Sequence, residues 1–431
     1  MPLEPNTFES KWIKFLPLLL ILVLYSGLSL HHASIANTNY TLADQSAFFN
    51  YAKNFHDLGL DFESGRNRMP LYPFILNIFY SDDIETLAHR AQWFNCLFTS
   101  AFFLVLFPWL TRRLGYLESL CFITILLSTI FIYASAYMKC ENLFFLIHFI
   151  TVIYSAELLF NKRIHSLFIL GILFSVGYFL KASMVLMIGL WTSASLVLFF
   201  KNLKNTPFSK KDFCFCFLPF ITFFCIASPY LLENKKLYGT YFYNISSAHC
   251  FWMESWNEVC NYIAKNGSLS ELAKQNTPNL PSAQLYFSTH SFNEMFLKLF
   301  LGAKRVIRGY IQEPSFKHIL FWSCSTLLLV FHWIKMSFNP IQFFKKNSFL
   351  ILYLCIGFSA TSWFIPIGRG NRFIINYMIP FLFLMIHAYK YSDTSKSKTL
   401  KYSIYISLFI AVFDFLYLFT SPSYYSTFHG N

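Results

Sequence analysis

Long apolar runs separated by short polar segments dominate the chain. A helix needs about 20 apolar residues to cross the hydrocarbon core of a bilayer, and tilt accommodates some deviation from this length. Eleven runs approach it, at residues 12–30, 91–110, 119–138, 142–160, 166–180, 182–200, 213–232, 317–334, 347–367, 373–389 and 402–420. The pattern therefore predicts one all-α, polytopic membrane domain over residues 1–431, with about eleven transmembrane helices.

The composition agrees with this prediction. Of the 431 residues, 55% are apolar and 13% are charged, about half the ~25% of charged residues in an ordinary soluble domain. So few polar side chains could not cover the apolar ones in a water-soluble globule. The net charge of +13 would favour nucleic acid binding in a soluble protein, but Lys and Arg also gather in the cytoplasmic loops of membrane proteins. We therefore expect contacts with membrane lipids and none with nucleic acid.

The basic residues between the runs predict the orientation of the helices, because cytoplasmic loops are enriched in Lys and Arg. With the N-terminus inside and the C-terminus outside, the inner segments hold most of them: Lys11, Lys14, Arg112, Arg113, Lys162, Arg163, Lys201, Lys204, Lys210, Lys211, Lys335, Lys345, Lys346, Lys390, Lys396, Lys398 and Lys401. Two long polar segments, 31–90 and 233–316, then lie outside. The first run could instead be a signal peptide that is cleaved after Ala36, although the topology also accommodates it as a span.

One charge, Lys181, interrupts the apolar stretch from residue 166 to residue 200. This stretch is too long for a single span of ordinary tilt. We predict two short helices joined by an outer turn at Lys181, Ala182 and Ser183. At that boundary the ammonium group could contact lipid headgroups or a bound phosphate.

The first outer segment contains Asp44, which precedes apolar residues at helical spacing: Phe48, Tyr51, Ala52 and Phe55. This spacing predicts a helix that lies along the membrane surface and begins near Asp44. Aspartate is a preferred helix cap, so capping alone could account for Asp44. The alternative is that this carboxylate has a catalytic function.

Two arginines follow in the stretch Arg66-Asn67-Arg68-Met69-Pro70-Leu71-Tyr72-Pro73. The guanidinium group is a forked donor that suits a phosphate. Arginine and tyrosine near a span can also anchor a protein at the lipid headgroups. Both interpretations of Arg66 and Arg68 remain open at this point.

The order of these features resembles that of the GT-C superfamily of membrane glycosyltransferases, in particular dolichyl-phosphate-mannose-protein mannosyltransferase and lipid A aminoarabinose transferase. Members typically carry an acidic residue soon after the first span and then an R-x-P-x-Y-P-like stretch. Later pieces agree in order: Glu141 at the start of the fourth span, Gly171 to Lys181, Pro229-Tyr230 with Asn234 and Tyr238-Gly239, and Gly368-Arg369-Gly370-Asn371-Arg372 before Pro380. The sequence departs from the family at Gln45, where many members have a second acidic residue.

The resemblance implies transfer of a sugar from a polyprenyl-phosphate donor to a hydroxyl of a glycan, lipid or protein acceptor. It also implies an active site on the periplasmic face of a bacterial inner membrane. Asp44 would be the base, and Glu141 would orient the acceptor or brace a cation, unless it merely pairs with Lys139. The phosphate would be held by five cationic residues: Arg66, Arg68, Lys181, Arg369 and Arg372. One displacement with a single base implies inversion at the anomeric carbon.

Other functions remain possible on this sequence. A lipid-linked glycan polymerase or ligase would use related donors, but such proteins concentrate their function in later outer loops. A transporter or flippase would be expected to carry charges within several spans and internal symmetry, and neither is evident. We expect no cofactor and no metal, because the histidines and cysteines lack metal-ligand spacing. Cys250 and Cys260 could pair if the second outer segment faces an oxidising compartment.

Overall fold

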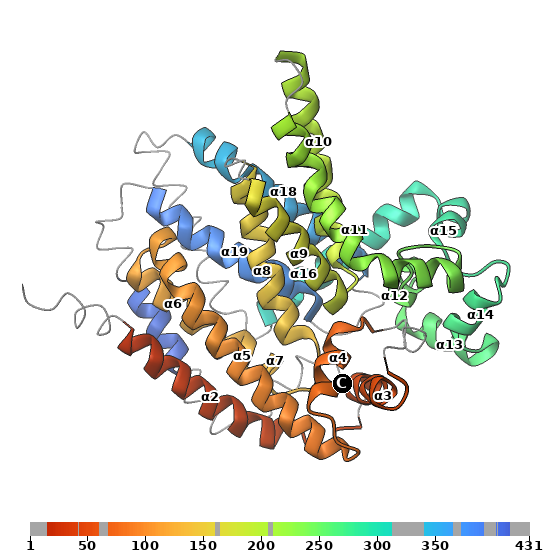
Figure 1. The fold of residues 1–431 in the computed structure, drawn as a ribbon, viewed down its shortest axis with the longest axis horizontal. Helices are drawn as coiled ribbons and strands as arrows, with labels where there is room; N and C mark the ends of the chain where they lie inside the picture. Colours follow the sequence, from red (N-terminus) through yellow and green to blue (C-terminus); the bar gives the residue numbers. More distant parts are fainter. Residues whose placement is uncertain are drawn as a thin grey trace, which may run out of the picture.

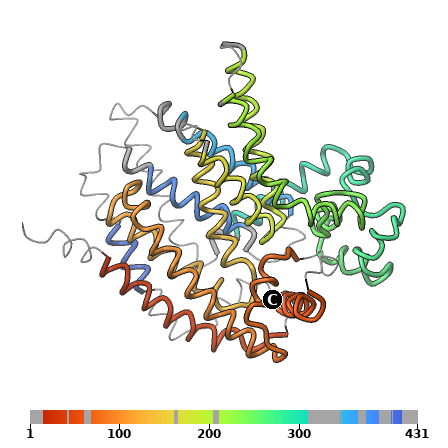
Figure 2. Tube along the Cα trace, viewed as in Figure 1, coloured from red at the N-terminus to blue at the C-terminus, as the bar shows by residue number. Residues whose placement is uncertain are grey.

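The fold is given by a computed structural model, which describes residues 15–41, 43–59, 68–159, 164–205, 210–312, 340–364, 372–391, 402 and 404–413 (Figure 2). Within these ranges every element is a helix (Figure 1). The first half of the chain contributes α2 (Leu16–Ala36), α3 (Ala43–Leu58), α4 (Leu71–Ile78), α5 (Ile84–Arg113), α6 (Tyr116–Leu126), the π-helix η1 (Leu127–Phe131), α7 (Ile132–Ala134), α8 (Glu141–Leu158), α9 (Ile164–Leu180) and α10 (Met184–Asn205).

The second half of the chain begins with a long helix, continues through several short ones and then returns to long helices. It contributes α11 (Lys210–Tyr238), α12 (Ile245–Ala248), the 3-10 helix η2 (Cys250–Trp252), α13 (Trp256–Asn266), α14 (Leu269–Lys274), α15 (Ala283–Thr289), α16 (Phe292–Gln312), α18 (Pro340–Phe364) and α19 (Arg372–Tyr391). The short helices α12 to α15 gather at one side of the molecule, away from α2, α5 and α6 (Figure 1).

Seven helices of the described chain are long and apolar enough to cross a membrane: Leu16–Ala36, Ile84–Arg113, Tyr116–Ala134, Glu141–Leu158, Met184–Leu203, Asp212–Tyr238 and Asn347–Phe364. Three shorter apolar helices, His165–Leu180, Ile374–His387 and Ile404–Phe413, coincide with further predicted runs. The run at 317–334 lies outside the described residues. The prediction of an all-α, multi-pass membrane protein is therefore confirmed, whereas the number of eleven spans is not.

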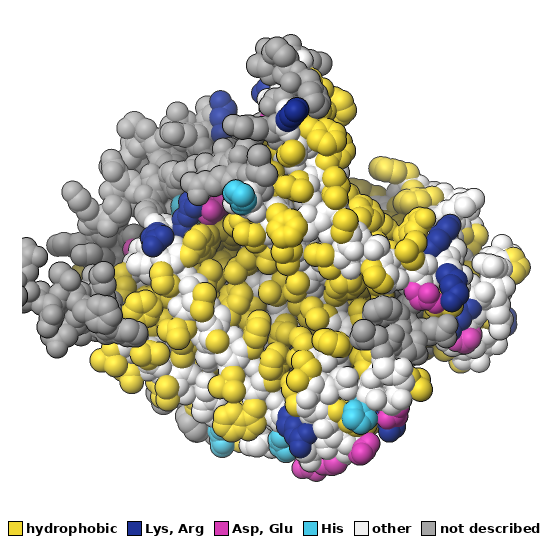
Figure 3. Space-filling view, in the orientation of Figure 1, with side chains coloured by type: hydrophobic (Ala, Val, Ile, Leu, Met, Phe, Trp, Pro, Cys, Tyr) yellow, Lys and Arg dark blue, Asp and Glu magenta, His cyan; other side chains and the backbone are white. Residues whose placement is uncertain are grey.

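The surface of the helices also suits a bilayer. Hydrophobic side chains spread over a broad face of the molecule, and charged side chains lie towards its margins (Figure 3). Val23 on α2, Val105 on α5 and Val197 on α10 are more than two-thirds exposed. Contiguous exposed apolar surface of this extent marks a region that is covered by lipid or by another protein.

The apolar face of α3 differs from the prediction. The structure confirms a helix that begins near Asp44, but Phe48, Tyr51 and Phe55 are buried in the protein. The ring of Phe48 packs edge-on against that of Tyr72 on α4, with 5.3 Å between the ring centroids. The helix therefore packs with this face against protein. Helical spacing alone could not distinguish lipid from protein as the apolar environment of this face.

The chain breaks between α9 and α10 where it was predicted to break. Helix α9 ends at Leu180, and α10 begins at Met184, so Lys181, Ala182 and Ser183 form the turn. The limits of the two polar segments are less accurate. Helix α5 begins at Ile84, and α11 continues to Tyr238, so both helices extend into the segments predicted as 31–90 and 233–316.

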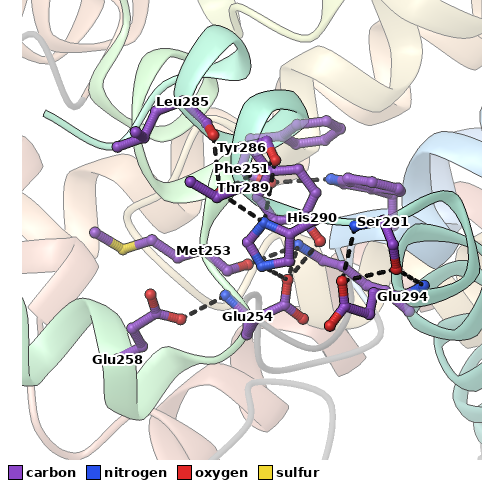
Figure 4. Close-up of polar contacts among 12 residues, drawn as sticks. Phe251, Met253, Glu254, Glu258, Leu285, Tyr286, Thr289, His290, Ser291 and Glu294 are labelled. Carbon is purple, nitrogen blue, oxygen red and sulfur yellow. Dashed lines mark hydrogen bonds and ion pairs between the residues drawn. The ribbon is translucent and has the colours of Figure 1, made fainter. Parts of the chain in front are cut away.

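Within the second polar segment, an ionic cluster around the buried Lys298 holds the residues after η2 against α16 (Figure 4). Lys298 of α16 donates to the carbonyl oxygen of Met253 at 2.7 Å and lies 3.5 Å from the carboxylate of Glu254. Burial lowers the pKa of Lys298, and the nearby Glu254 carboxylate opposes that shift. Beside this cluster, Trp363 of α18 donates to the carbonyl oxygen of Phe251 at 3.0 Å. These contacts fix the position of Phe251.

Cys250 and Cys260 are both free thiols in the structure, so the suggested disulfide between them is not formed. Cys250 is buried beside Met253 and Val259, whereas Cys260 lies exposed on α13. The two side chains therefore occupy different environments. Their closeness in sequence did not reveal this, because Cys250 begins η2 and Cys260 lies on a separate helix, α13.

Helix α16 packs closely on α18 because Gly302 carries no side chain. A β-carbon at Gly302 would overlap the backbone carbonyl oxygen of Ser362. We expect Gly302→Ala to lower the free energy of unfolding by about 2 kcal/mol or more, because an overpacked contact forces the backbones apart. Thermal unfolding of the purified protein would measure this. The control is Gly27→Ala, where a β-carbon meets no atom within 4 Å; equal losses in the two variants would contradict the expectation.

Candidate functional site

A cavity of about 730 Å³ opens where several helices end. Its lining comes from the start of α3, the residues before α4, the start of α8, the turn between α9 and α10, and residues 242–251. Helices α18 and α19 complete it with the end of the first and the beginning of the second. A volume of this size is typical of small-molecule sites.

Asp44 and Arg68 form an ion pair at the edge of this cavity. Arg68 Nη2 donates to Asp44 Oδ1, and both side chains are about one-fifth exposed. Lys139 Nζ lies 4.0 Å from Asp44 Oδ2. Asp44 is the second residue of α3, so the positive end of the helix dipole also favours its negative charge. Two cations and the N-terminus of a helix thus surround the Asp44 carboxylate.

Glu141 and Lys181 form a second ion pair in the same cavity. Lys181 Nζ lies 3.5 Å from Glu141 Oε1 and 5.4 Å from the centre of the Phe144 ring. Glu141 is the first residue of α8, and Lys181 opens the turn after α9. Of the two roles considered for Glu141, bracing a cation agrees with this contact. The cation is Lys181, which lies 40 residues away in the sequence.

The structure thus brings four of the predicted residues to one cavity: Asp44, Arg68, Glu141 and Lys181. Arg66 and Arg369 lie outside the described residues. Arg372 is the first residue of α19, one turn before the cavity-lining Asn376, but its side chain is not among those described.

Gln45, where many members of the GT-C superfamily have an acid, has a structural role here. It is buried and forms a reciprocal amide pair with Asn37, with distances of 3.0 Å and 2.8 Å. Gln45 Oε1 also accepts a hydrogen bond from the backbone N–H of Met138 at 2.9 Å. A carboxylate at position 45 could not donate to Asn37. The Asn37–Gln45 pair ties the start of α3 to the turn that precedes Glu141.

Buried amides of α5 and α8 hold the same turn from the other side. Gln92 donates to the carbonyl oxygen of Ala136 at 3.0 Å, and Asn95 donates to that of Tyr137 at 3.1 Å. Asn142 of α8 donates to the carbonyl oxygen of Asn95 at 3.1 Å. These residues were missed at the sequence level. Their signal was present, because polar side chains within an apolar run usually have a specific partner.

The other end of the cavity is apolar. Helix α10 contributes Leu186, Gly189 and Leu190, and α18 contributes Ile356 and Ala360. The cavity-lining residues of α10 extend from Val185 to Ser193, which corresponds to about 12 Å along a helix. The cavity therefore continues from a charged end into a groove between two apolar helices. This shape suits a ligand with an anionic head and an apolar tail.

No cluster of three or more His, Cys, Asp or Glu side chains that could hold a metal occurs among the residues that the structure describes. Comparison with known proteins gives no further assignment: no family model matches the chain, and no curated protein has a significantly similar sequence. The site must therefore be interpreted from its own chemistry.

Proposed function

We propose that the protein is a membrane glycosyltransferase that moves a sugar from a polyprenyl-phosphate donor to an acceptor hydroxyl. The acceptor class is a glycan, a lipid or a protein. The observation that carries this proposal is that one cavity has both a charged end and an apolar end. Two carboxylate–cation pairs, Asp44 with Arg68 and Glu141 with Lys181, lie at one end, and an apolar groove lies at the other.

In this proposal Asp44 is the general base. The acceptor oxygen attacks the anomeric carbon while the bond from that carbon to the phosphate oxygen breaks. The hydroxyl proton passes to Asp44, and the bonding electrons leave with the phosphate. A carboxylate has several lone-pair sites, so Asp44 can hold Arg68 and still accept a proton. A single displacement from the face opposite the phosphate inverts the anomeric carbon.

The leaving group needs positive charge rather than a proton, because a phosphate ester departs as an anion. Arg68 and Lys181 supply fixed cations in the cavity, where low polarity strengthens their effect. Glu141 positions Lys181 through their 3.5 Å contact. Arg66, Arg369 and Arg372 are further proposed phosphate ligands on the sequence resemblance.

We expect Lys181→Gln to lower kcat/KM for transfer by about 30- to 1,000-fold, since a transition-state contact of this kind contributes about 2–4 kcal/mol. Glutamine keeps a flexible polar side chain, one bond shorter than lysine, and carries no charge. The matched control is Lys236→Gln at the end of α11, where the exposed lysine pairs with Glu233 outside the cavity. Equal kinetics of the two variants would indicate that Lys181 only anchors the protein at headgroups.

Transfer assays with the purified protein test the proposed function. We expect sugar transfer from one or more polyprenyl-phosphate monosaccharides and none from a polyprenyl-diphosphate oligosaccharide. Transfer from the diphosphate donor alone would indicate a glycan polymerase or ligase. Movement of either donor across a vesicle membrane without transfer would indicate a flippase.

We further propose that the cavity faces the periplasm of a bacterial inner membrane. The basic residues Arg112, Arg113 and Lys201 lie near the ends of α5 and α10 that are remote from the cavity. The positive-inside rule therefore supports an outward-facing cavity. Reporter fusions at Asn205 and Ser268 would test this orientation. A cytoplasmic signal from Ser268 would contradict it.

A further inference from the structure

The wall of the cavity formed by α18 and α19 contains a buried hydrogen-bond acceptor that no group of the described residues satisfies. Asn376 lines the cavity, its residue exposure is 5%, and its Oδ1 atom has no hydrogen-bond partner in the part of the chain that the structure describes. Buried polar groups in proteins nearly always have a partner, because leaving one unpaired costs free energy. An orphan acceptor facing a cavity therefore points to a ligand that donates a hydrogen bond there.

Other asparagines with a buried, unpartnered side-chain oxygen do not share this position. In the described part of the chain these are Asn77, Asn95 and Asn234, and none of them lines the cavity. Asn376 is thus distinguished by its location as well as by its missing partner.

The neighbours of Asn376 give this wall a fixed form. Tyr377, the next residue, packs over Gly357 of α18, where any β-carbon would overlap its ring. The side chain of Tyr377 also lies near that of Thr361, one turn after Gly357 on α18. Thr361 is itself buried and lines the cavity. The contacts of Tyr377 hold α19 against α18 and fix the depth of Asn376.

An aromatic surface lies along the same cavity. Phe251 and Phe364 both line it, and their rings are nearly parallel, with an interplanar angle of 16° and 5.9 Å between centroids. The combination of a polar acceptor with aromatic faces is characteristic of sugar binding, because a pyranose ring has apolar C–H faces and a rim of hydroxyl groups. Helix α18 also lines the apolar groove, at Ile356 and Ala360, just before Thr361. A ligand with its tail in that groove would have its head beside Thr361 and Asn376.

We propose that Asn376 is a specificity residue, whose Oδ1 atom accepts a hydrogen bond from one hydroxyl group of the donor sugar. This inference deepens the proposed function and rests on it. A donor with a hydroxyl at the matching position satisfies the acceptor, whereas a donor that lacks this hydroxyl leaves it unpaired. The substrate class is therefore a polyprenyl-phosphate sugar with a free hydroxyl at that carbon.

The test measures equilibrium binding of donor alone, without acceptor, to the purified protein. The probes are a polyprenyl-phosphate hexose and its four monodeoxy analogues at C2, C3, C4 and C6, repeated for glucose, galactose and mannose. With the best-bound hexose we expect one analogue to bind about 10- to 100-fold more weakly than the parent. Asn376→Leu should bind the parent as weakly as the wild type binds that analogue, and should no longer distinguish the two.

Two further variants keep the result interpretable. Asn376→Asp retains an acceptor oxygen and should retain the discrimination between the parent and the deoxy donor. Asn234→Leu removes an asparagine that is also buried and lacks a partner at Oδ1, but lies outside the cavity. It should bind all donors with the wild-type pattern.

The possible failures differ from one another. If the wild type binds the parent donor but discriminates against no deoxy analogue, the role of Asn376 is wrong and the proposed function stands. The same conclusion follows if Asn376→Leu keeps the wild-type discrimination. If the wild type binds none of the polyprenyl-phosphate sugars, the proposed function itself is contradicted, and the role of Asn376 with it.

Discussion

Asp44→Asn should slow sugar transfer by about 10²- to 10⁴-fold, the usual contribution of a general base, and should leave the protein folded. Asparagine has the same shape as aspartate and can still accept a hydrogen bond from Arg68. It cannot take up the proton of the acceptor hydroxyl. If Asp44 served only to stabilise the first turn of α3, asparagine would serve almost as well, because the two residues are comparable helix caps.

The matched control is Asp57→Asn on the same helix. Asp57 forms an exposed ion pair with Lys53 at 3.2 Å and does not line the cavity. Surface pairs of this kind contribute about 0–1 kcal/mol to stability, so both activity and thermal unfolding should stay near wild type. Transfer rates and melting curves of the two variants would be compared directly. Near-normal transfer by Asp44→Asn would refute its role as the base.

Gly189→Phe should nearly abolish donor binding by filling the apolar groove. Gly189 lines the cavity on α10, and a β-carbon there would meet no atom within 4 Å. The first atom of the new side chain therefore meets no clash, and the ring would extend into the groove. If it excludes only four methylene-sized groups of the lipid tail, the loss is about 3 kcal/mol, or more than 100-fold in Kd. Equilibrium binding of a long-chain polyprenyl-phosphate sugar would measure this.

Gly27→Phe provides the control for this substitution. Gly27 is also within an apolar helix and also has open space around its β-carbon position, but it does not line the cavity. Its phenylalanine variant should bind donor normally. A donor with a tail of one isoprene unit should lose much less affinity on Gly189→Phe than the long-chain donor does. Unchanged binding of the long-chain donor would show that the tail lies elsewhere.

Much of the fold was predictable because each span is specified locally. Apolar runs of sufficient length form helices in a bilayer, whatever their neighbours. The turn after α9 was predictable for a similar reason, since Lys181 is the one charge in an apolar stretch. The environment of α3 was not predictable, because the apolar spacing of Phe48 and Phe55 is the same whether that face meets lipid or α4. Only the tertiary packing distinguishes these cases.

Four charged residues of the candidate site were predictable from the sequence, but their pairings were not. The order of acidic and basic motifs selected Asp44, Arg68, Glu141 and Lys181. The partner of each carboxylate lies 24 or 40 residues away, and no local pattern encodes contacts at such separations. Asn376 was overlooked because a single asparagine in an apolar run does not indicate whether its oxygen has a partner.

The Asn37–Gln45 pair has a mechanical consequence for the two carboxylates. It joins the start of α3 to the residues just before Glu141, so we expect the segments that carry Asp44 and Glu141 to move as one rigid unit, called here the frame. Lys181 belongs to a different turn and contacts that frame through Glu141 at 3.5 Å. If the cavity widens to admit a substrate, we expect it to open along the Glu141–Lys181 contact while the spacing of the two carboxylates stays constant. Spin labels at Asn50, an exposed residue of α3 that leaves the Asn37–Gln45 pair intact, and at Ser183 would report such a motion as a change in their separation when donor binds.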